Sequence, residues 1–305
     1  MDRPPARHGT VAGSMSDSHR PLVCLVTGAT GGSGLATAEG LARSGADVII
    51  GARSPARAEA ARDRIASATG SDRLEVALAD LSVQADVRRL AAEVARRHDR
   101  LDVLVNNAGL VAMRRQQTAD GFELTWAVNH LAPFLLTNLL TDLLVASAPA
   151  RVVTVSSGAH TAARMDLDDP QFAHRRYSGM AAYGQSKLAN ILFTAELARR
   201  LEGTGVTANC LHPGVVGSDF GRRAGGLFGL GWRIIRPFAL SPERGARTSI
   251  YLATSPEVAG VTGRYFFRSR PAQPSSLARD ADLARRLWDA SERMTGLAPA
   301  SPSRG

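Results

Sequence analysis

Tyr183 and Lys187 stand four residues apart in the stretch YGQSK, a spacing that could support acid–base chemistry. Side chains four residues apart lie on the same face of a helix. The lysine would then place a cation near the phenol, favour the phenolate and lower a pKa that is ordinarily about 10. A tyrosine adjusted in this way can exchange a proton near neutral pH. The alternative is a solvated surface pair without a function, so the rest of the chain must decide.

A glycine-rich turn, TGATGGSG, covers residues 27–34 and follows an apolar run. Gly28, Gly32 and Gly34 would let the backbone turn tightly and approach a pyrophosphate at the N-terminus of the next helix. Free N–H groups and the helix dipole favour negative charge there. Such a turn can also be a simple loop. After the first strand of an alternating chain, however, it indicates nucleotide binding.

The second apolar run ends in IIGARS, with Arg53 at its tip and no acidic residue. An acid about 20 residues beyond the glycines would bind the ribose 2′-hydroxyl of NAD. A guanidinium at this place would instead pair with a 2′-phosphate. The alternative is a solvated arginine at a strand end. The pattern favours NADP(H) as the cofactor.

Apolar runs alternate with helical patterns, and these elements would carry the residues named above. Ser54 and Pro55 are typical of a helix start, with serine as the N-cap and proline at the first helical position. The alternation predicts an α/β fold: a single doubly wound Rossmann domain with a mostly parallel seven-stranded sheet and helices on both faces. The expected strands are 22–29, 46–53, 74–82, 101–109, 150–157, 206–214 and 263–267. The expected helices are 33–44, 54–68, 83–98, 119–147 and 181–202.

Composition limits the class of protein. The 305 residues are 44% hydrophobic, which is typical of a globular chain. We expect one domain over 22–296, with disordered tails at 1–21 and 297–305. The formal charge is +9, but the basic residues are scattered, so no nucleic-acid partner is expected. Cys24 and Cys210 lie in apolar runs and are expected to be buried, not in a disulfide or a metal site.

No stretch approaches the roughly 18 unbroken apolar residues of a membrane span. Residues 1–21 lack the apolar core of a signal peptide. We therefore expect no transmembrane segment and a cytoplasmic location.

Four motifs in chain order resemble the short-chain dehydrogenase/reductase family over 22–296: TGATGGSG, NNAG at 106–109, VSS at 155–157, and YGQSK. Longer stretches, among them VNHLAPFLLTNLL, YGQSKLANILFTAELARRL and GTGVTANCLHPGVV, are similar to its retinol dehydrogenase-like branch. That branch generally uses NADP(H). The resemblance implies an NADP-dependent oxidoreductase that interconverts a small apolar alcohol and an aldehyde or ketone. It also implies a homodimer or a homotetramer.

The resemblance assigns the site residue by residue. It implies a catalytic set of Asn129, Ser157, Tyr183 and Lys187, with Tyr183 as general acid/base, and no metal. Ser157 would orient the substrate oxygen, and Asn129 would hold a water that links Lys187 to solvent. One departure is Ser33, where the family usually has an apolar residue; we expect it to alter local packing more than chemistry. The implied cofactor-binding residues are Gly28, Gly32, Ser33, Gly34, Arg53, Asp80, Leu81, Asn107, Tyr183, Lys187, Pro213 and Gly214.

Some alternatives stay open. Ser156 competes with Ser157, and Asn129 could simply cap a helix. Tyr177 is a second tyrosine, but Ala181 stands four residues after it, so it lacks the lysine partner. A catalytically silent dinucleotide-binding sensor or scaffold protein is the alternative function.

The substrate walls are expected in the loops 158–180 and 215–240. Within the second loop, the apolar segment 225–240 is interpreted either as a short core helix or as a mobile lid. Arg233 and Arg236 of this segment could also rest on an anionic membrane surface as a peripheral contact.

Overall fold

Eight strands form one sheet in the order β3-β2-β1-β4-β5-β6-β7-β8 in the computed structural model, which describes residues 20–214 and 240–297. Strands β1 to β7 are parallel, and β8 pairs antiparallel with β7. Strand order reverses between β1 and β4, the place where such sheets bind ligands. The strands are β1 (Val23–Thr27), β2 (Asp47–Ala52), β3 (Leu74–Leu78), β4 (Val103–Asn106), β5 (Ala150–Val155), β6 (Val206–His212), β7 (Tyr265–Phe267) and β8 (Arg270–Pro271).

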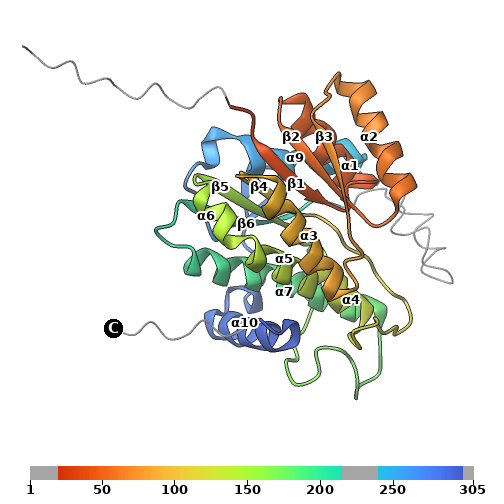
Figure 1. Cartoon of the computed structure of the whole chain (residues 1–305). Helices are drawn as coiled ribbons and strands as arrows, with labels where there is room; N and C mark the ends of the chain where they lie inside the picture. Colours follow the sequence, from red (N-terminus) through yellow and green to blue (C-terminus); the bar gives the residue numbers. More distant parts are fainter. Residues whose placement is uncertain (1–19, 215–239, 298–305) are drawn as a thin grey trace, which may run out of the picture.

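Helices cover both faces of this sheet (Figure 1). The predicted doubly wound Rossmann fold is therefore confirmed. The long helices of one face are α1 (Gly32–Arg43), α2 (Pro55–Thr69) and α9 (Pro242–Thr254). Those of the other face are α3 (Gln84–Arg97), α5 (Ala132–Leu139) and α7 (Gly179–Arg200), with α10 (Ala281–Thr295) packed on α7. Shorter elements are α4 (Leu124–Trp126), the π-helix η1 (Ala127–Leu131), α6 (Thr141–Ala146), η2 (Gly158–Ala162), η4 (Pro256–Val258) and η5 (Leu277–Arg279).

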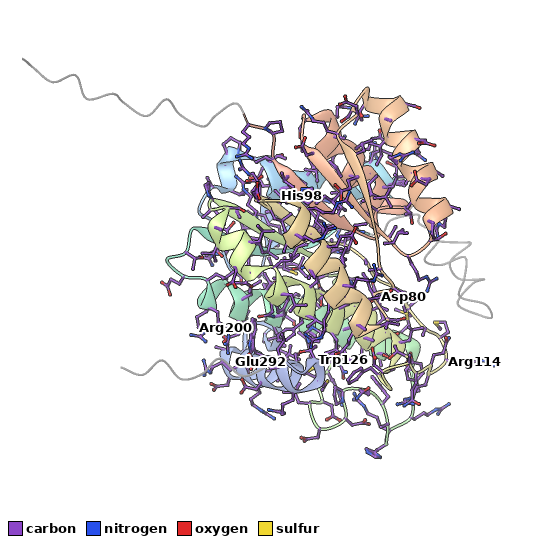
Figure 2. All side chains as sticks on the ribbon, in the orientation of Figure 1. Asp80, His98, Arg114, Trp126, Arg200 and Glu292 are labelled. Carbon is purple, nitrogen blue, oxygen red and sulfur yellow. The ribbon has the colours of Figure 1, made fainter. Side chains whose placement is uncertain are left out.

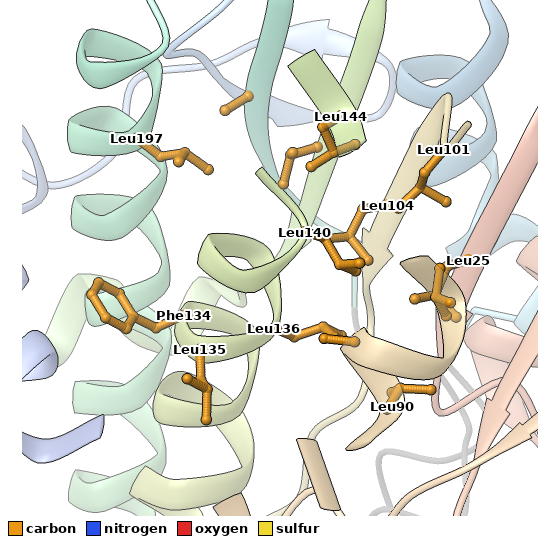
Figure 3. Packing of buried hydrophobic residues seen from close by; sticks show 14 of the residues in the cluster. Leu25, Leu90, Leu101, Leu104, Phe134, Leu135, Leu136, Leu140, Leu144 and Leu197 are labelled. Carbon is orange, nitrogen blue, oxygen red and sulfur yellow. The ribbon is translucent and has the colours of Figure 1, made fainter. Parts of the chain in front are cut away.

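Alternate residues of the strands supply the two cores. In β1, Cys24 and Val26 pack toward α1, α2 and α9, whereas Leu25 packs toward α3 and α5. Figure 3 shows Leu25 and Leu104 from the sheet against residues such as Leu90 and Leu136 from the helices. Both faces of a parallel sheet must be covered, which explains why the strands are almost continuously apolar.

Three details differ from the sequence-based expectation. The seven-strand count was wrong, because β8 is only two residues long and contains Pro271, which is tolerated at a sheet edge. The helix expected from residue 119 begins only at Leu124, because Gly121 takes a left-handed φ of 81° and Glu123 caps the helix. Ser54 does occupy the N-cap position before Pro55, but its side chain makes no capping hydrogen bond.

Helices α9 and α10 were not predicted, although both have clear local start signals. Ser241 and Asp280 accept hydrogen bonds from the first turns of α9 and α10. Trp288 packs α10 against α7, because its ring stacks on Phe193 of α7. Its Nε1 donates to Glu292 of the same helix, a residue labelled in Figure 2.

Several predictions concern residues at the margins of this description. Three segments lie outside the described residues: the N-terminal tail up to residue 19, the segment 215–239 and the C-terminal tail from residue 298. The second of them contains most of the expected lid or core helix. Cys24 and Cys210 are buried free thiols, as expected. No helix in the described part of the chain is both long and apolar enough to cross a bilayer.

Candidate functional site

A cleft of about 660 Å³ opens at the carboxyl edge of the sheet, where the loops after β1 to β6 converge. Every residue predicted to bind the cofactor lines this cleft, as do Ser157, Tyr183 and Lys187 of the predicted catalytic set. Asn129 does not line it. Figure 2 labels Asp80, which follows β3 at this edge. The predicted residues that line the cleft are therefore brought together, although they come from the ends of six strands and from helix α7.

The glycine turn is a close-packed cradle. Gly28 has a left-handed φ of 68°, and its N–H donates to the carbonyl of Gly51 (2.9 Å). A Cβ atom at Gly34 would lie 2.4 Å from the carbonyl oxygen of Gly28 and 2.3 Å from Nδ2 of Asn107. Any side chain there would push α1 away from the turn. The backbone of the turn is thus exposed to the cleft at a helix N-terminus, which suits the pyrophosphate of a dinucleotide.

Ser33 connects this turn to the loop after β4. Its hydroxyl donates to Oδ1 of Asn107 (3.2 Å), and Nδ2 of Asn107 donates to the carbonyl of Thr27 (2.9 Å). The hydroxyl therefore has a polar partner. This goes beyond the altered packing expected from the departure at Ser33.

Two arginines stand at the other end of the cleft. Arg53 follows β2, with Nη1 3.7 Å from Oδ2 of Asp80. Arg57, in the first turn of α2, also lines the cleft and was missed in the sequence. A Cβ atom at Gly31 would lie 3.4 Å from Nη2 of Arg57, so this guanidinium reaches the glycine turn. Its place in the first turn of the helix that follows Arg53 was the available signal.

Ser157 and Tyr183 meet at the opposite end. Ser157 ends the loop after β5, and its Oγ accepts from the N–H of Ala159 (3.2 Å). Burial raises the pKa of the Tyr183 phenol, and its hydrogen bond with Ser157 opposes that rise. The sequence predicted that Lys187 would lower this pKa, but burial of the phenol raises it instead. The phenol is therefore protonated at neutral pH.

Lys187 is buried on the same helix face, 5.8 Å from the centroid of the Tyr183 ring. Its Nζ donates to the carbonyl of Val155 (2.9 Å). Burial lowers the pKa of this ammonium to about 8. A Cβ atom at Gly109 would lie only 3.2 Å from Nζ, so the glycine leaves the cleft side of the ammonium uncovered.

Asn129 lies behind the wall of the cleft, in the π-helix η1. Its Oδ1 accepts from the N–H of Leu110 (2.8 Å), and its Nδ2 donates to the carbonyl of Leu110 and to Oγ of Ser186. Its amide thus holds the loop after β4 rather than capping a helix. π-Helical turns of this kind are frequent at functional sites.

The competing residues have other partners. Both serines border the cleft, but the buried Ser156 hydroxyl donates to the carbonyl of Lys187 (2.6 Å), whereas the Ser157 side chain is hydrogen-bonded to Tyr183. The Tyr177 hydroxyl donates to the carbonyl of Ala112 (2.7 Å) and lies 3.0 Å from Oε1 of Glu123, outside the cleft.

The walls were predicted only in part. From the expected loop 158–180, only Gly158, Ala159 and Met180 line the cleft. Leu110, Val111 and His212 were missed, because nothing local marks them as wall residues. No group of three or more metal-binding side chains is found among residues 20–214 and 240–297.

Comparisons with known proteins agree with this geometry. The family model described as short chain dehydrogenase matches residues 22–225. Retinol dehydrogenase 13 of Homo sapiens is 43% identical over 282 residues, covering 90% of this chain and 84% of that protein. Retinol dehydrogenase 14 of Homo sapiens is 45% identical over 292 residues, covering 90% and 86%.

Two solved structures are similar over most of their length. A crystal structure of an uncharacterized protein from Mycobacterium paratuberculosis has a TM-score of 0.73 and 36% identity, covering 92% of this chain and 96% of that one. The RhlG/NADP active-site complex of Pseudomonas aeruginosa has a TM-score of 0.65 and 30% identity, covering 80% and 93%.

Proposed function

Since the chain belongs to the short-chain dehydrogenase/reductase family, in its retinol dehydrogenase-like branch, we propose that it is an NADP(H)-dependent enzyme that interconverts an apolar alcohol and the corresponding aldehyde or ketone. The family makes it an oxidoreductase. The observation that carries the proposal is the meeting of Ser157, Tyr183 and Lys187 in the cleft that the glycine turn lines.

Reduction of a carbonyl needs a hydride on carbon and a proton on oxygen. NADPH, when bound, supplies the hydride. The Ser157 hydroxyl, oriented by the Ala159 N–H, would hold the carbonyl oxygen against the Tyr183 phenol. The protonated phenol would then give its proton to that oxygen, and the alcohol and NADP⁺ result. In the reverse direction the same phenolate would take the proton back.

Lys187 would serve this step as a buried cation. At neutral pH most of it is charged, since its pKa is about 8. The charge would stabilise the phenolate left after proton transfer. Its Nζ faces the gap above Gly109, from which it could also hold a ribose hydroxyl of the cofactor.

The preference for NADP(H) rests on Arg53 and Arg57 at the end of β2 and the start of α2. Two guanidiniums beside one edge of the cleft suit a dianionic 2′-phosphate better than a ribose hydroxyl. The RhlG complex, 30% identical, was solved with NADP.

The apolar substrate is inferred from the names of the retinol dehydrogenase relatives and from the wall. Leu110, Val111 and Met180 line the cleft, and Met180 is exposed. A cytoplasmic location, a homodimer or homotetramer and a membrane contact at 225–240 remain predictions from the sequence.

The test of the proposed function is the loss of NADPH absorbance with aldehydes and ketones of increasing chain length. We expect turnover that improves with apolar length. Tight binding of NADPH with no turnover on any carbonyl, and no reduction of NADP⁺ with the matching alcohols, would contradict the proposal and favour the sensor or scaffold alternative.

Cofactor preference gives a separate prediction. The unmutated protein is expected to bind NADPH more tightly than NADH, and Arg53→Asp should reduce that preference by about ten- to a hundredfold, the loss of one charge-assisted pair. The measurement is the dissociation constant of each cofactor by fluorescence titration.

A matched control is Arg62→Asp. Arg62 lies on α2 and pairs with Glu59 and Asp63 outside the cleft, yet its replacement changes the net charge equally. It should leave the preference unchanged. Equal affinity of the unmutated protein for both cofactors would contradict the assignment of Arg53.

A further inference from the structure

The peptide bond between Ser157 and Gly158 is held at both ends by histidine side chains. Its carbonyl accepts from Nδ1 of His160 (2.7 Å), and its N–H donates to Nδ1 of His212 (3.1 Å). The backbone N–H of His160 also donates to the same carbonyl (3.2 Å). This peptide directly follows the serine proposed to hold the substrate oxygen.

The contacts of His160 determine its tautomer. Its Nε2 accepts from the N–H of Ser275 (3.2 Å), so the proton must be on Nδ1, which donates to Ser157. The ring is buried and packs edge-on against Tyr265, with centroids 5.2 Å apart. His160 therefore ties the serine loop to the segment after β8.

His212 carries its proton on the other nitrogen. Its Nδ1 accepts from the N–H groups of both Gly158 (3.1 Å) and Gly214 (3.3 Å), which leaves the proton on Nε2. Burial, with a smaller effect of the nearby His160, lowers the pKa of His212 to about 4, so the ring is neutral at physiological pH. The ring stacks on Phe267, with centroids 5.1 Å apart.

Both imidazoles rest on one strand. Tyr265 and Phe267 are two residues apart on β7, so their side chains are on the same face of the sheet. The register pairs His212 of β6 with Phe267 of β7. The two histidines are thus fixed to the last parallel strand.

We propose that His160 and His212 are positioning residues, a histidine clamp in opposite tautomers that holds the Ser157–Gly158 peptide. The clamp fixes the Ser157 hydroxyl relative to Tyr183. Through Gly214 it also fixes the Pro213–Gly214 turn, which the family resemblance assigns to cofactor binding. This inference rests on the proposed function, because it needs Ser157 to act on a substrate. An error of about 1 Å in such a group can cost roughly a hundredfold in rate.

Amide side chains separate the positioning role from ordinary core packing. Asparagine carries its amide close to the place of Nδ1, and glutamine carries it close to that of Nε2. His160→Asn can still donate to Ser157, and His212→Asn can still accept from Gly158. The two glutamine variants lose these contacts, although they remain polar and of similar size.

We expect the alanine and glutamine variants at both positions to lose about a hundredfold in kcat. The asparagine variants should restore most of that loss. If both histidines act on the same peptide, their effects should not be independent. The double variant, His160→Gln with His212→Gln, should then lose less kcat than the product of the two single fold-losses. Each kcat is compared at equal folded fraction, measured from the melting curve.

The matched control is His98, which pairs with Glu75 (3.3 Å) far from Asp80 and the cleft (Figure 2). His98→Asn and His98→Gln should give equal kcat. Equal kcat for the asparagine and glutamine variants at His160 and His212, once corrected for folding, would overturn the clamp and leave two core histidines.

A second measurement does not depend on turnover. Nitrogen chemical shifts of ¹⁵N-labelled histidine show which ring nitrogen carries the proton. We expect Nδ1–H for His160 and Nε2–H for His212; the same tautomer in both would refute the clamp. If these tautomers are found but no carbonyl is reduced, it is the proposed function that fails. If carbonyls are reduced and the glutamine variants keep their kcat, the clamp fails alone.

Discussion

Replacing Tyr183 with phenylalanine is expected to lower kcat by about 10²- to 10⁴-fold, the usual contribution of a general acid/base. The variant loses only the hydroxyl, so the ring still fills its place on α7 and NADPH should bind with nearly unchanged affinity. Steady-state kinetics on an accepted carbonyl and a fluorescence titration of NADPH measure the two effects separately. A near-normal kcat would remove Tyr183 from the proposed role.

Tyr177→Phe is the matched control. The Tyr177 hydroxyl lies between the carbonyl of Ala112 and the buried carboxylate of Glu123 and does not reach the cleft. Its loss leaves two buried acceptors with one partner fewer, which costs about 1–3 kcal/mol of stability. The control should therefore melt earlier but keep its kcat, the opposite of Tyr183→Phe.

Replacing Lys187 with methionine is expected to affect both catalysis and cofactor binding. Methionine has nearly the same volume as this buried side chain, but it lacks the cation and the hydrogen bond to the carbonyl of Val155. We expect kcat to fall by about a hundredfold or more. The affinity for NADPH should fall by about tenfold, since a bond to the ribose would be lost.

Asn190→Ala tests the hydrogen bond to the Val155 carbonyl separately from the positive charge of Lys187. Nδ2 of Asn190 also donates to the carbonyl of Val155 (3.2 Å), one turn further along α7. This control removes a donor to the same carbonyl but leaves the charge, so it should lower the melting temperature and keep the affinity for NADPH. If Asn190→Ala reproduced both losses of Lys187→Met, the cation would have no special part.

The pH dependence of the reduction rate gives a further test of the role of Lys187. Because burial lowers the pKa of Lys187 to about 8, the cation is present below that pH and is lost as pH rises through it. The rate of carbonyl reduction in the unmutated protein should therefore decline through about pH 8. Lys187→Met should lack this decline, and its presence in the variant would assign the titration to another group.

Local patterns were sufficient for the parts of the site that are short in sequence. Gly34 was recognised because a turn between a strand and a helix needs glycine, and the structure shows the reason, since Gly28 and Asn107 leave no room for a Cβ atom. Arg53 was recognised because a strand tip has a fixed place beside the glycine turn. Both predictions needed only neighbouring residues.

The rest depended on contacts between distant residues. His160 and Ser275 are 115 positions apart, and His212 and Gly158 are 54 apart, so no local pattern could show that they share a hydrogen-bonded unit. The direction in which the pKa of Tyr183 shifts could also not be predicted from the sequence. It depends on how deeply packing buries the phenol, whereas the spacing to Lys187 indicates only which groups are neighbours.

Because β7 lies near the C-terminus, the strand that supports His160 and His212 is synthesised long after the glycine turn. Ribosomes add about 5–20 residues per second, so roughly 12 to 50 s separate the synthesis of Val23 in β1 from that of Tyr265 in β7. Strands β1 and β2 and the glycine turn between them are made early in that interval. Tyr265, Phe267 and Ser275, against which His160 and His212 rest, are made at its end. A growing chain therefore contains its nucleotide turn for roughly 12 to 50 s before it contains the residues that hold Ser157 in place, so the supports of the reactive end are the last of the site residues to be synthesised.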